Sequence, residues 1–491
     1  MSGLTMPLSI ALPLVAATLL AVVRRPARPR RIVLLGTLGL LLAHHVVLLV
    51  AVADGAVLAT RIGGWPGGVA ITFVLDTFSA LMLVATSLLA LVCVWFAIAA
   101  GEDERSMFAP LVLVLVAGVA GVLLTGDLFN LFVFLEVTLM PSYALMSMSS
   151  DRARFAVGRV FVSISLLTST VFLIAVGLVY GIVGTVDLAS LAGAAADSPP
   201  LAAAGAVLLA ALAVKSALVP VHGWLAETYP HASPGVTALF SGLHTKLGIY
   251  AIYRLYSLLY GGEARFAWIA VGVCVLTMAV GVLAAFGQRS MRSILSFHMI
   301  SQNGYIALGA VLAAPAGAAA GIFYLMHHMV AKASLFLSAG AVEHRYGTGR
   351  LASFGGLARR EPLVALAFIV PALSLAGMPP FSGFLAKYVL VRAAIGQGQY
   401  IAAVAAVAVG ALTLASMIKI WQSVFIAKPK DDDRHEAPQL TAAPVGLVAP
   451  ALSLAAVTVI LGLTGDWLLA LCEQAGRGLA DYTAYAEAVV D

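Results

Sequence analysis

Apolar segments of membrane-spanning length recur along almost the whole chain, separated by short polar breaks. A transmembrane helix needs about 20 consecutive apolar residues, and this pattern predicts about fourteen spans. They are expected near residues 4–23, 32–53, 71–99, 108–125, 128–149, 156–183, 205–226, 235–259, 267–286, 293–313, 317–339, 362–395, 401–426 and 443–471. The sequence therefore predicts an all-α polytopic membrane protein. No charged residue precedes Arg24, so the first apolar segment is expected to be a permanent helix rather than a cleaved signal peptide.

Composition supports a membrane protein and excludes several other classes. Apolar residues make up 62% of the chain and charged residues 10%, whereas soluble domains carry about 25% charged residues. The net charge of +5 does not indicate nucleic-acid binding, because the basic residues are spread over short loops. Cys93, Cys274 and Cys472 lie far apart and predict neither a disulfide framework nor an Fe–S site.

The basic residues also predict how the chain crosses the membrane. Most of the 28 Lys and Arg residues lie in every second loop, and the positive-inside rule places those loops in the cytoplasm. Both termini are then expected on the extracytoplasmic side of a prokaryotic plasma membrane. The acidic run Asp431–Asp433 is expected to belong to a solvated loop rather than to a cation site.

Lysines inside the predicted helices are the strongest functional signal. They are Lys215, Lys246, Lys332, Lys387 and Lys419. Each lysine at the centre of a membrane costs about 2.5–3.5 kcal/mol, which is hard to explain without a function. Lysine, unlike arginine, can lose its proton when it is desolvated, so these positions indicate groups that cycle between charged and neutral forms.

Glu136 is the matching acid, because it lies in a long apolar segment (126–146). We expect a lysine on a neighbouring helix as its partner, forming a switchable proton site; a static buried salt bridge is the alternative. Lys215 precedes Pro220, whereas Lys387 follows Pro379 and Pro380. Proline interrupts helices, so the seventh and twelfth spans are expected to be broken.

The opposite placement of lysine and proline in the two broken spans suggests an inverted repeat. The predicted organisation is a three-helix segment (1–107), a first half (108–260), a second half (261–426), and a cytoplasmic loop with a final helix (427–491).

Histidines accompany the lysines on consecutive predicted helices. They are His244, His298, His327 and His328, and His298 lies in a stripe with Ser296, Ser301, Gln302 and Asn303. A single membrane histidine is more often a packing residue, but together these groups predict a hydrated lateral proton path, since imidazole titrates near neutrality. No carboxylate or thiolate completes a metal or haem ligand set, so we predict no metal and no cofactor.

Three further groups keep two interpretations each. Lys419 lies near the cytoplasmic end of its helix, where it either extends to the membrane surface or forms part of a proton exit. Asp76 and Asp127 lie near helix ends, where capping is as plausible as conduction. Walker A, GxSxG, HExxH and CxxC motifs are absent from the sequence, so energy from ATP or electrons would have to enter through another chain.

Several segments resemble a known family. GDLFNLFVFLEVTLMPSYALM (126–146), PVHGWL (220–225) and PPFSGFLAKYVLV (379–391) are similar to the proton-translocating antiporter family that includes the L, M and N subunits of respiratory complex I and the large subunits of Mrp-type Na⁺/H⁺ antiporters. With IGGWPGGVAITFVLDTFSALM (62–82), they look most like the D subunits of the Mrp antiporters.

The resemblance implies proton translocation by Glu136, Lys215, Lys246 and Lys387, and about fourteen helices with two inverted five-helix repeats. It also implies a multisubunit complex that couples H⁺ to Na⁺, and hence a secondary transporter rather than an enzyme. Lys387 departs from the glutamate of the M subunit of complex I, whereas the L and N subunits share the lysine. The alternatives are a membrane subunit of a complex I-like NADH–quinone oxidoreductase or membrane hydrogenase, and a non-conducting scaffold, which the buried lysines disfavour.

Overall fold

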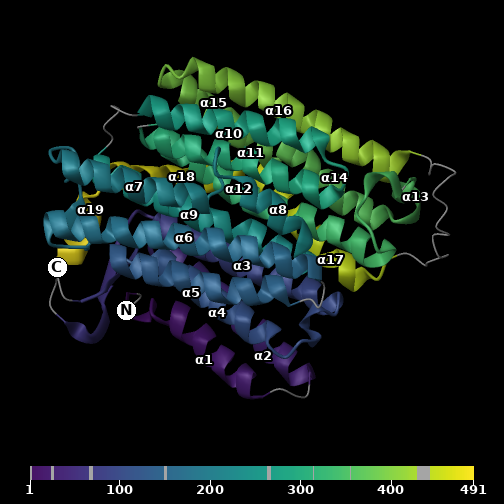
Figure 1. Cartoon of the computed structure of the whole chain (residues 1–491), viewed down its shortest axis with the longest axis horizontal. Coiled ribbons are helices and arrows are strands. Elements are labelled where there is room, and N and C mark those ends of the chain that lie inside the picture. The colour runs from purple at the N-terminus through teal and green to yellow at the C-terminus, as the bar shows by residue number, and fades with distance from the viewer. Residues whose placement is uncertain are drawn as a thin grey trace.

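Most helices of the protein run side by side along the long axis of the molecule (Figure 1). The computed structural model describes residues 3–23, 27–65, 70–148, 152–261, 267–312, 314–353, 355–427 and 443–490, without the side chains of 152–155 and 490. The N- and C-terminal ends both lie at the left of Figure 1, so the chain begins and ends on the same side of the bundle.

The helices follow one another with short connections. The first part contains α1 (Leu8–Val22), α2 (Ala27–Ala51), α3 (Thr77–Ala99), α4 (Phe108–Leu124), α5 (Leu128–Ser147), α6 (Arg152–Val183), α7 (Pro199–Lys215), α8 (Gly223–Thr228) and α9 (Pro234–Tyr260). The second part contains α10 (Ala267–Gly287), α11 (Met291–Val311), α12 (Pro315–Tyr346), α13 (Leu357–Arg360), α14 (Pro362–Ala376), α15 (Ser382–Gly396), α16 (Tyr400–Ile420) and a π-helical turn (Trp421–Ile426). The chain ends with α17 (Val445–Leu463), α18 (Gly465–Ala480) and α19 (Thr483–Val490).

Hydropathy confirms the prediction of a polytopic helical membrane protein. Within the described residues, 9 helices are long and apolar enough to cross a membrane. Three more helices, α4, α7 and α14, are apolar but shorter. Many apolar side chains on α1, α2, α6 and α16 are exposed, as expected where a bundle faces lipid or another subunit.

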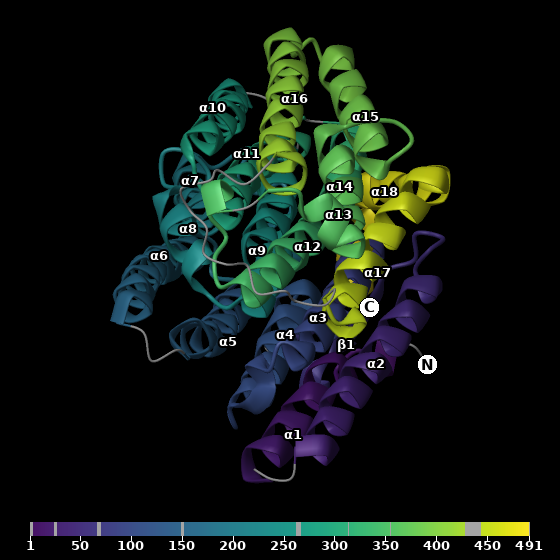
Figure 2. The same ribbon diagram turned by 90° about the vertical axis from the view of Figure 1, so that its right-hand side faces the viewer.

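Helix α12 forms the centre of the bundle. It packs against α9, α11, α14, α15, α17 and α18, and its most apolar window is completely buried. In Figure 2 these helices surround it on several sides. Its 32 residues give a length of about 48 Å at 1.5 Å per residue, longer than the hydrocarbon core of about 30 Å. This helix therefore connects one end of the bundle to the other.

Two spans are broken where prolines predicted it. The helix of the seventh span ends at Lys215 and resumes as α8 at Gly223, with Pro220 in between. In the predicted twelfth span, the first helix, α14, ends at Ala376, and the second helix, α15, begins at Ser382. In the first break Ala217 has a φ of 53°, a left-handed conformation that costs energy for a residue other than glycine. The surrounding structure must therefore hold this break in place.

The expectation of an all-α chain is wrong in one segment. Strand β1 (Leu58–Arg61) pairs antiparallel with β2 (Thr72–Leu75). The residues of β2, TFVL, are β-branched or aromatic with one leucine, which favours a strand. The predicted span 71–99 thus begins as a strand, and its helix starts only at Thr77.

The C-terminal region also differs from the single final helix expected over 443–471. Helix α17 ends at Leu463, and α18 and α19 follow it. The end of α17 lies against the break between α14 and α15, because a Cβ added at Gly462 would come within 2.7 Å of the Ser382 nitrogen. A side chain at Gly462 would therefore separate α17 from this break. The acidic run Asp431–Asp433 lies outside the described residues.

Candidate functional site

Lys215 and its neighbours form the first cluster of the site. The Lys215 ammonium donates a hydrogen bond of 3.3 Å to the Ser169 hydroxyl of α6. It also lines a cavity of about 30 Å³ between α5, α6, α7, α8 and α9, together with Trp224 and His244. A cavity of this size has room for about two water molecules. His244 Nε2 lies 2.7 Å from the Ser142 hydroxyl, so the cavity has polar groups on several sides.

Glu136 lies close enough to Lys215 for its charge to act on the lysine. No ion pair within 4.0 Å joins the two side chains in the described structure, however. The static salt bridge considered from the sequence is therefore not formed. Glu136 Oε1 is buried and has no hydrogen-bond partner. A buried carboxylate oxygen needs a partner, so this position requires water or a moving donor.

Lys246 on α9 is fully buried near the centre of the bundle. Its ammonium donates to Thr245 Oγ1 at 3.0 Å and to Asn303 Oδ1 at 3.1 Å. His328 of α12 is close enough to feel the charge of Lys246, and neither of its ring nitrogens has a hydrogen-bond partner. The lysine thus lies between an amide that accepts a hydrogen bond from it and an imidazole whose nitrogens have no hydrogen-bond partner.

Lys332 lies on α12, four residues after His328, and is also fully buried. Its ammonium donates to the Leu295 carbonyl at 2.8 Å. His298 on α11 interacts electrostatically with both Lys332 and Lys387. Its Nε2 contacts the Ser416 hydroxyl. His298 therefore lies between the central lysines and the second broken span.

Lys387 follows the second break and binds the end of the preceding helix. Its ammonium donates to the carbonyls of Leu375 and Ala376, both at 2.9 Å. The last carbonyls of a helix lack intrahelical partners and carry partial negative charge, so they favour a cation. The Tyr305 ring lies 5.6 Å away, and His327 Nδ1 is 2.8 Å from the Ser382 hydroxyl that begins α15.

Lys419, Asp76 and Asp127 all lie at helix ends. Lys419 donates to the carbonyls of Phe286 at 2.6 Å and Gln288 at 2.9 Å, where α10 ends. Asp76 and Asp127 accept from backbone amides in the first turns of α3 and α5. Each of the three thus makes the contacts of a helix cap.

Buried arginine pairs are the feature that the sequence analysis missed. Arg254 lies inside α9, is 6% exposed, and forms an ion pair with Asp76 at 2.6 Å. Its guanidinium also donates to the Ser79 hydroxyl at 3.2 Å. The position of Asp76 before an apolar helix was the available signal, because a buried carboxylate needs a cation.

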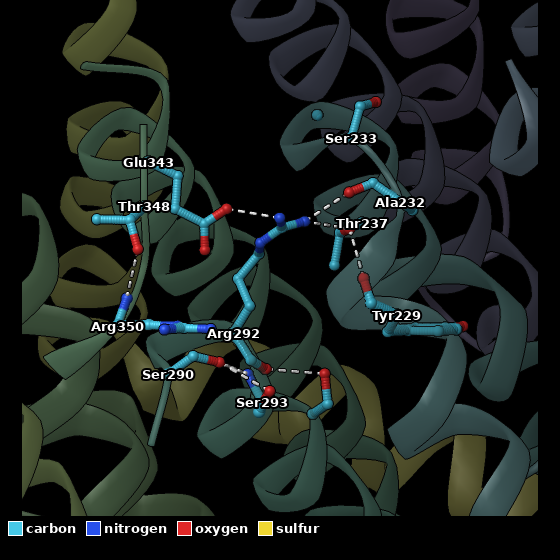
Figure 3. Close-up of polar contacts among 12 residues, drawn as sticks. Tyr229, Ala232, Ser233, Thr237, Ser290, Arg292, Ser293, Glu343, Thr348 and Arg350 are labelled. Atoms are coloured by element: carbon cyan, nitrogen blue, oxygen red, sulfur yellow. Dashed lines mark hydrogen bonds and ion pairs between the residues drawn. The ribbon is translucent and has the colours of Figure 1, made fainter. Parts of the chain in front are cut away.

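A second arginine ties together three helices that carry the site (Figure 3). Arg292, at the start of α11, pairs with Glu343 near the end of α12 at 2.5 Å. It also donates to the carbonyl of Ala232, two residues before α9 begins, at 2.5 Å. Figure 3 shows the Arg292 guanidinium between Glu343 on one side and Ala232 and Thr237 on the other. These contacts fix α9, α11 and α12 relative to one another at one end.

The described residues contain no group of three or more His, Cys, Asp or Glu side chains placed to hold a metal ion. They do bring nine of the ten predicted residues into neighbouring clusters across α5, α7, α9, α11, α12 and α15. Electrostatic interactions link Glu136 with Lys215, Lys246 with His328 and Lys332, and His298 with Lys387. Lys419 stands apart at the end of α10.

A helical bundle with ionisable groups connected through its interior defines the class of protein as a membrane transport subunit. The family model described as "NADH:quinone oxidoreductase/Mrp antiporter, TM" matches residues 125–413. The D subunit of the Na(+)/H(+) antiporter of Alkalihalophilus pseudofirmus is 36% identical over 458 residues, covering 92% of each chain. The corresponding D subunit of Bacillus subtilis is 29% identical and covers 98% of each chain.

Solved structures agree with these relatives. A chain in the structure of the Mrp complex from Dietzia sp. has a TM-score of 0.96 and 47% identity, covering 100% of this chain and 99% of that one. A chain of the archaeal membrane-bound sulfane sulfur reductase has a TM-score of 0.90 and 25% identity, covering 99% of each chain. The chain belongs to the NADH:quinone oxidoreductase/Mrp antiporter membrane-subunit family, which confirms the resemblance found in the motifs.

Proposed function

We propose that this chain is the D-type subunit of a multisubunit Na⁺/H⁺ antiporter, and that it carries protons through its buried lysines, histidines and Glu136. Relatives of nearly equal length are named as D subunits of Na(+)/H(+) antiporters, and a similar chain occurs in an Mrp complex. The other subunits of such a complex are its partners in the plasma membrane.

The observation that carries the proposal is the kind of acceptor that holds each buried lysine. Lys215, Lys246, Lys332 and Lys387 donate only to hydroxyl, amide or backbone carbonyl oxygens in the hydrogen bonds that the described structure contains. These acceptors carry no net charge, so loss of the proton leaves no isolated carboxylate behind. Such sites are suited to repeated protonation and deprotonation.

Unpartnered histidine nitrogens support a path between the lysines. His298 Nδ1, His327 Nε2 and both nitrogens of His328 are buried without hydrogen-bond partners. Buried polar atoms are normally satisfied, so these positions call for water molecules that bridge neighbouring groups. The proposed path passes Glu136, Lys215 and His244, then Lys246, His328 and Lys332, and finally His298, His327 and Lys387. The helix-end contacts of Lys419 favour a capping role, and we place it outside this path.

The finer architecture belongs to the same proposal. Counting each broken helix once, α4 to α9 and α10 to α16 give two halves of five spans with the break in the fourth span of each, and about fourteen spans in all. The predicted boundaries at 108, 261 and 426 fall at ends of helices or next to them, which supports this division. Both ends of the chain lie on one side of the bundle (Figure 1). The distribution of basic loops supports the proposal that this side faces the outside of the cell.

Transport in everted vesicles tests the proposal. The chain is expressed with its partner subunits in antiporter-deficient cells, an inside-acid gradient is imposed without an electron donor, and dye fluorescence is followed after Na⁺ is added. We expect Na⁺ to collapse the gradient in wild type but not in Glu136→Gln. Glu104→Gln, which changes an exposed carboxylate at the end of a short 3-10 helix, is the matched control and should behave as wild type. Na⁺-dependent collapse at the wild-type rate in assembled Glu136→Gln would remove Glu136 from the path.

A redox-driven proton pump is the second candidate, because the similar chain of the sulfane sulfur reductase belongs to a respiratory complex. The same vesicles distinguish the two. If Na⁺ has no effect and acidification requires an electron donor, the redox-driven function replaces antiport.

A further inference from the structure

Asn303 on α11 connects two lysine sites through one side chain. It is fully buried. Its Oδ1 accepts from the Lys246 ammonium at 3.1 Å, and its Nδ2 donates to the Ser216 carbonyl at 2.8 Å. Ser216 directly follows Lys215 at the end of α7. A single amide therefore bridges the lysine of α9 and the end of the helix that carries the neighbouring lysine.

The Ser216 carbonyl lies at the break between α7 and α8, where backbone groups lose their helical partners. The break is held from outside by two helices. Thr277 Oγ1 of α10 accepts from the Val219 nitrogen at 3.0 Å, and Asn303 of α11 donates to Ser216. Because Ala217 between them has a left-handed conformation, the break would relax if these contacts were lost.

The contact between α9 and the end of α7 is close. A Cβ added at Gly248, two residues after Lys246, would lie 3.2 Å from both the Ser216 nitrogen and the Leu212 carbonyl oxygen. The backbone of α9 thus touches the end of α7 almost directly. A small change on one side of this contact is passed to the other side, because packed interiors have little free space.

We infer that Asn303 is a positioning residue that couples the protonation state of Lys246 to the position of Lys215. A charged ammonium only donates, so it holds Oδ1 of Asn303 and leaves Nδ2 for the Ser216 carbonyl. Hydrogen bonds in such a chain strengthen one another. When Lys246 becomes neutral, this hold weakens, the Ser216 carbonyl is released, and the end of α7 with Lys215 can move.

The coupling rests on the proton-conducting function proposed above and adds a mechanical link between two of its sites. Other titratable groups that face Lys246 are His328 and Lys332, both on α12. Neither group has a hydrogen bond to the break of α7 in the described structure. Among the residues that the structure describes, Asn303 alone bonds to both Lys246 and the α7 break.

Hydrogen–deuterium exchange of the purified complex tests the coupling at peptides covering 216–222. Exchange is measured between pH 6 and 9 and divided by the intrinsic rate at each pH. In wild type we expect opening of this segment to be greater in the state in which Lys246 is neutral than in the state in which it is charged, and therefore to depend on pH. In Asn303→Leu the opening should be high and independent of pH, and Na⁺-driven exchange in vesicles should fall at least about tenfold with a changed pH profile.

Tyr253→Phe is the matched control. Tyr253 on α9 donates to the Ile306 carbonyl of α11 at 2.7 Å, so its loss weakens the same helix pair without touching a lysine. It should keep the wild-type pH dependence of exchange at 216–222. If Asn303→Leu does not assemble, Asn303→Asp replaces the donor to Ser216 with a carboxylate oxygen and places a negative charge that keeps Lys246 protonated. Because no donor to Ser216 remains at any pH, it should show the same pH-independent opening.

Wild-type pH dependence at 216–222 in an assembled Asn303 variant would overturn the coupling. This outcome is separate from failure of the proposed function. Suppose that wild-type vesicles show no Na⁺/H⁺ exchange, but that opening of segment 216–222 depends on pH in wild type and is independent of pH in Asn303→Leu. Antiport then fails as the function, and the coupling through Asn303 stands.

Discussion

Lys387→Arg separates the charge of this site from its ability to lose a proton. The Lys387 ammonium donates to the carbonyls of Leu375 and Ala376, both at 2.9 Å. Hydrogen bonds to a charged group contribute about 1.5–3 kcal/mol each, so the two together hold the end of α14 by about 3–6 kcal/mol. An arginine keeps a cation and several donors at this position, and the complex should assemble.

Transport should nevertheless stop in this variant. An arginine side chain has a pKa above about 12, so fewer than about one guanidinium in 10⁴ is neutral at pH 8. If each cycle requires a neutral group at this position, exchange falls by about four orders of magnitude, below detection. Lys387→Met should also stop transport, but it leaves two buried carbonyls without a donor at about 1–3 kcal/mol each, so it should lower stability as well.

Na⁺-driven dye recovery in everted vesicles measures transport, and thermal unfolding of the purified complex measures stability. Arg392→Lys, on the exposed face of the same helix, is the control and should change neither. Wild-type exchange by assembled Lys387→Arg would refute the reasoning, because it would show that position 387 transports without releasing its proton.

Three further predictions concern the frame around the site. Arg292→Gln leaves Glu343, whose side chain is 15% exposed, without its ion-pair partner. It should destabilise the complex by about 3–5 kcal/mol, seen as a lower unfolding temperature, whereas Arg292→Met with Glu343→Leu should recover part of the loss. Gly248→Ala brings a Cβ to 2.5 Å from the Ser216 hydroxyl oxygen and should cost about 1–3 kcal/mol by the same measurement; an unchanged unfolding temperature would mean that α9 can move away freely. Burial raises the pKa of the Glu102 carboxyl, so the folded protein binds a proton there more readily than the unfolded chain. The stability that this protonation contributes is complete below about pH 4.3 and is lost as pH rises through the raised pKa. Glu102→Gln should therefore flatten the fall in unfolding temperature between pH 5 and 8, and an unchanged slope would contradict this.

The features that follow from local sequence were predicted well. The apolar segments predicted most of the membrane spans, because a helix in lipid must be apolar along its length. Prolines located both breaks, because proline removes a backbone donor wherever it occurs. The buried lysines were recognised because the free-energy cost of placing a lysine within a membrane applies whatever residues surround it.

Features that depend on contacts between distant segments were not predicted. The burial of Arg254 depends on Asp76, which lies 178 residues earlier in the chain. Lys387 is held by backbone carbonyls. Every residue has a backbone carbonyl, so no pattern of side chains in the sequence indicates which ones bind the lysine. The missing ion pair between Glu136 and Lys215 depends on the distance between α5 and α7, which the sequence does not specify. Strand β2 was hidden because four apolar residues before a helix look like the helix itself.

The partners of arginine and lysine differ in a way that bears on mechanism. All four ion pairs in the described part of the chain use arginine, and their carboxylates lie at or near helix ends. The buried lysines of the proposed path bond instead to neutral oxygens. A carboxylate beside a lysine would hold its proton, and removing that proton would leave an unpaired buried charge. In the proposed mechanism, arginines form the permanent ion pairs and lysines bond to neutral acceptors, so the lysines would change charge while the ion pairs that fix the helices stay intact.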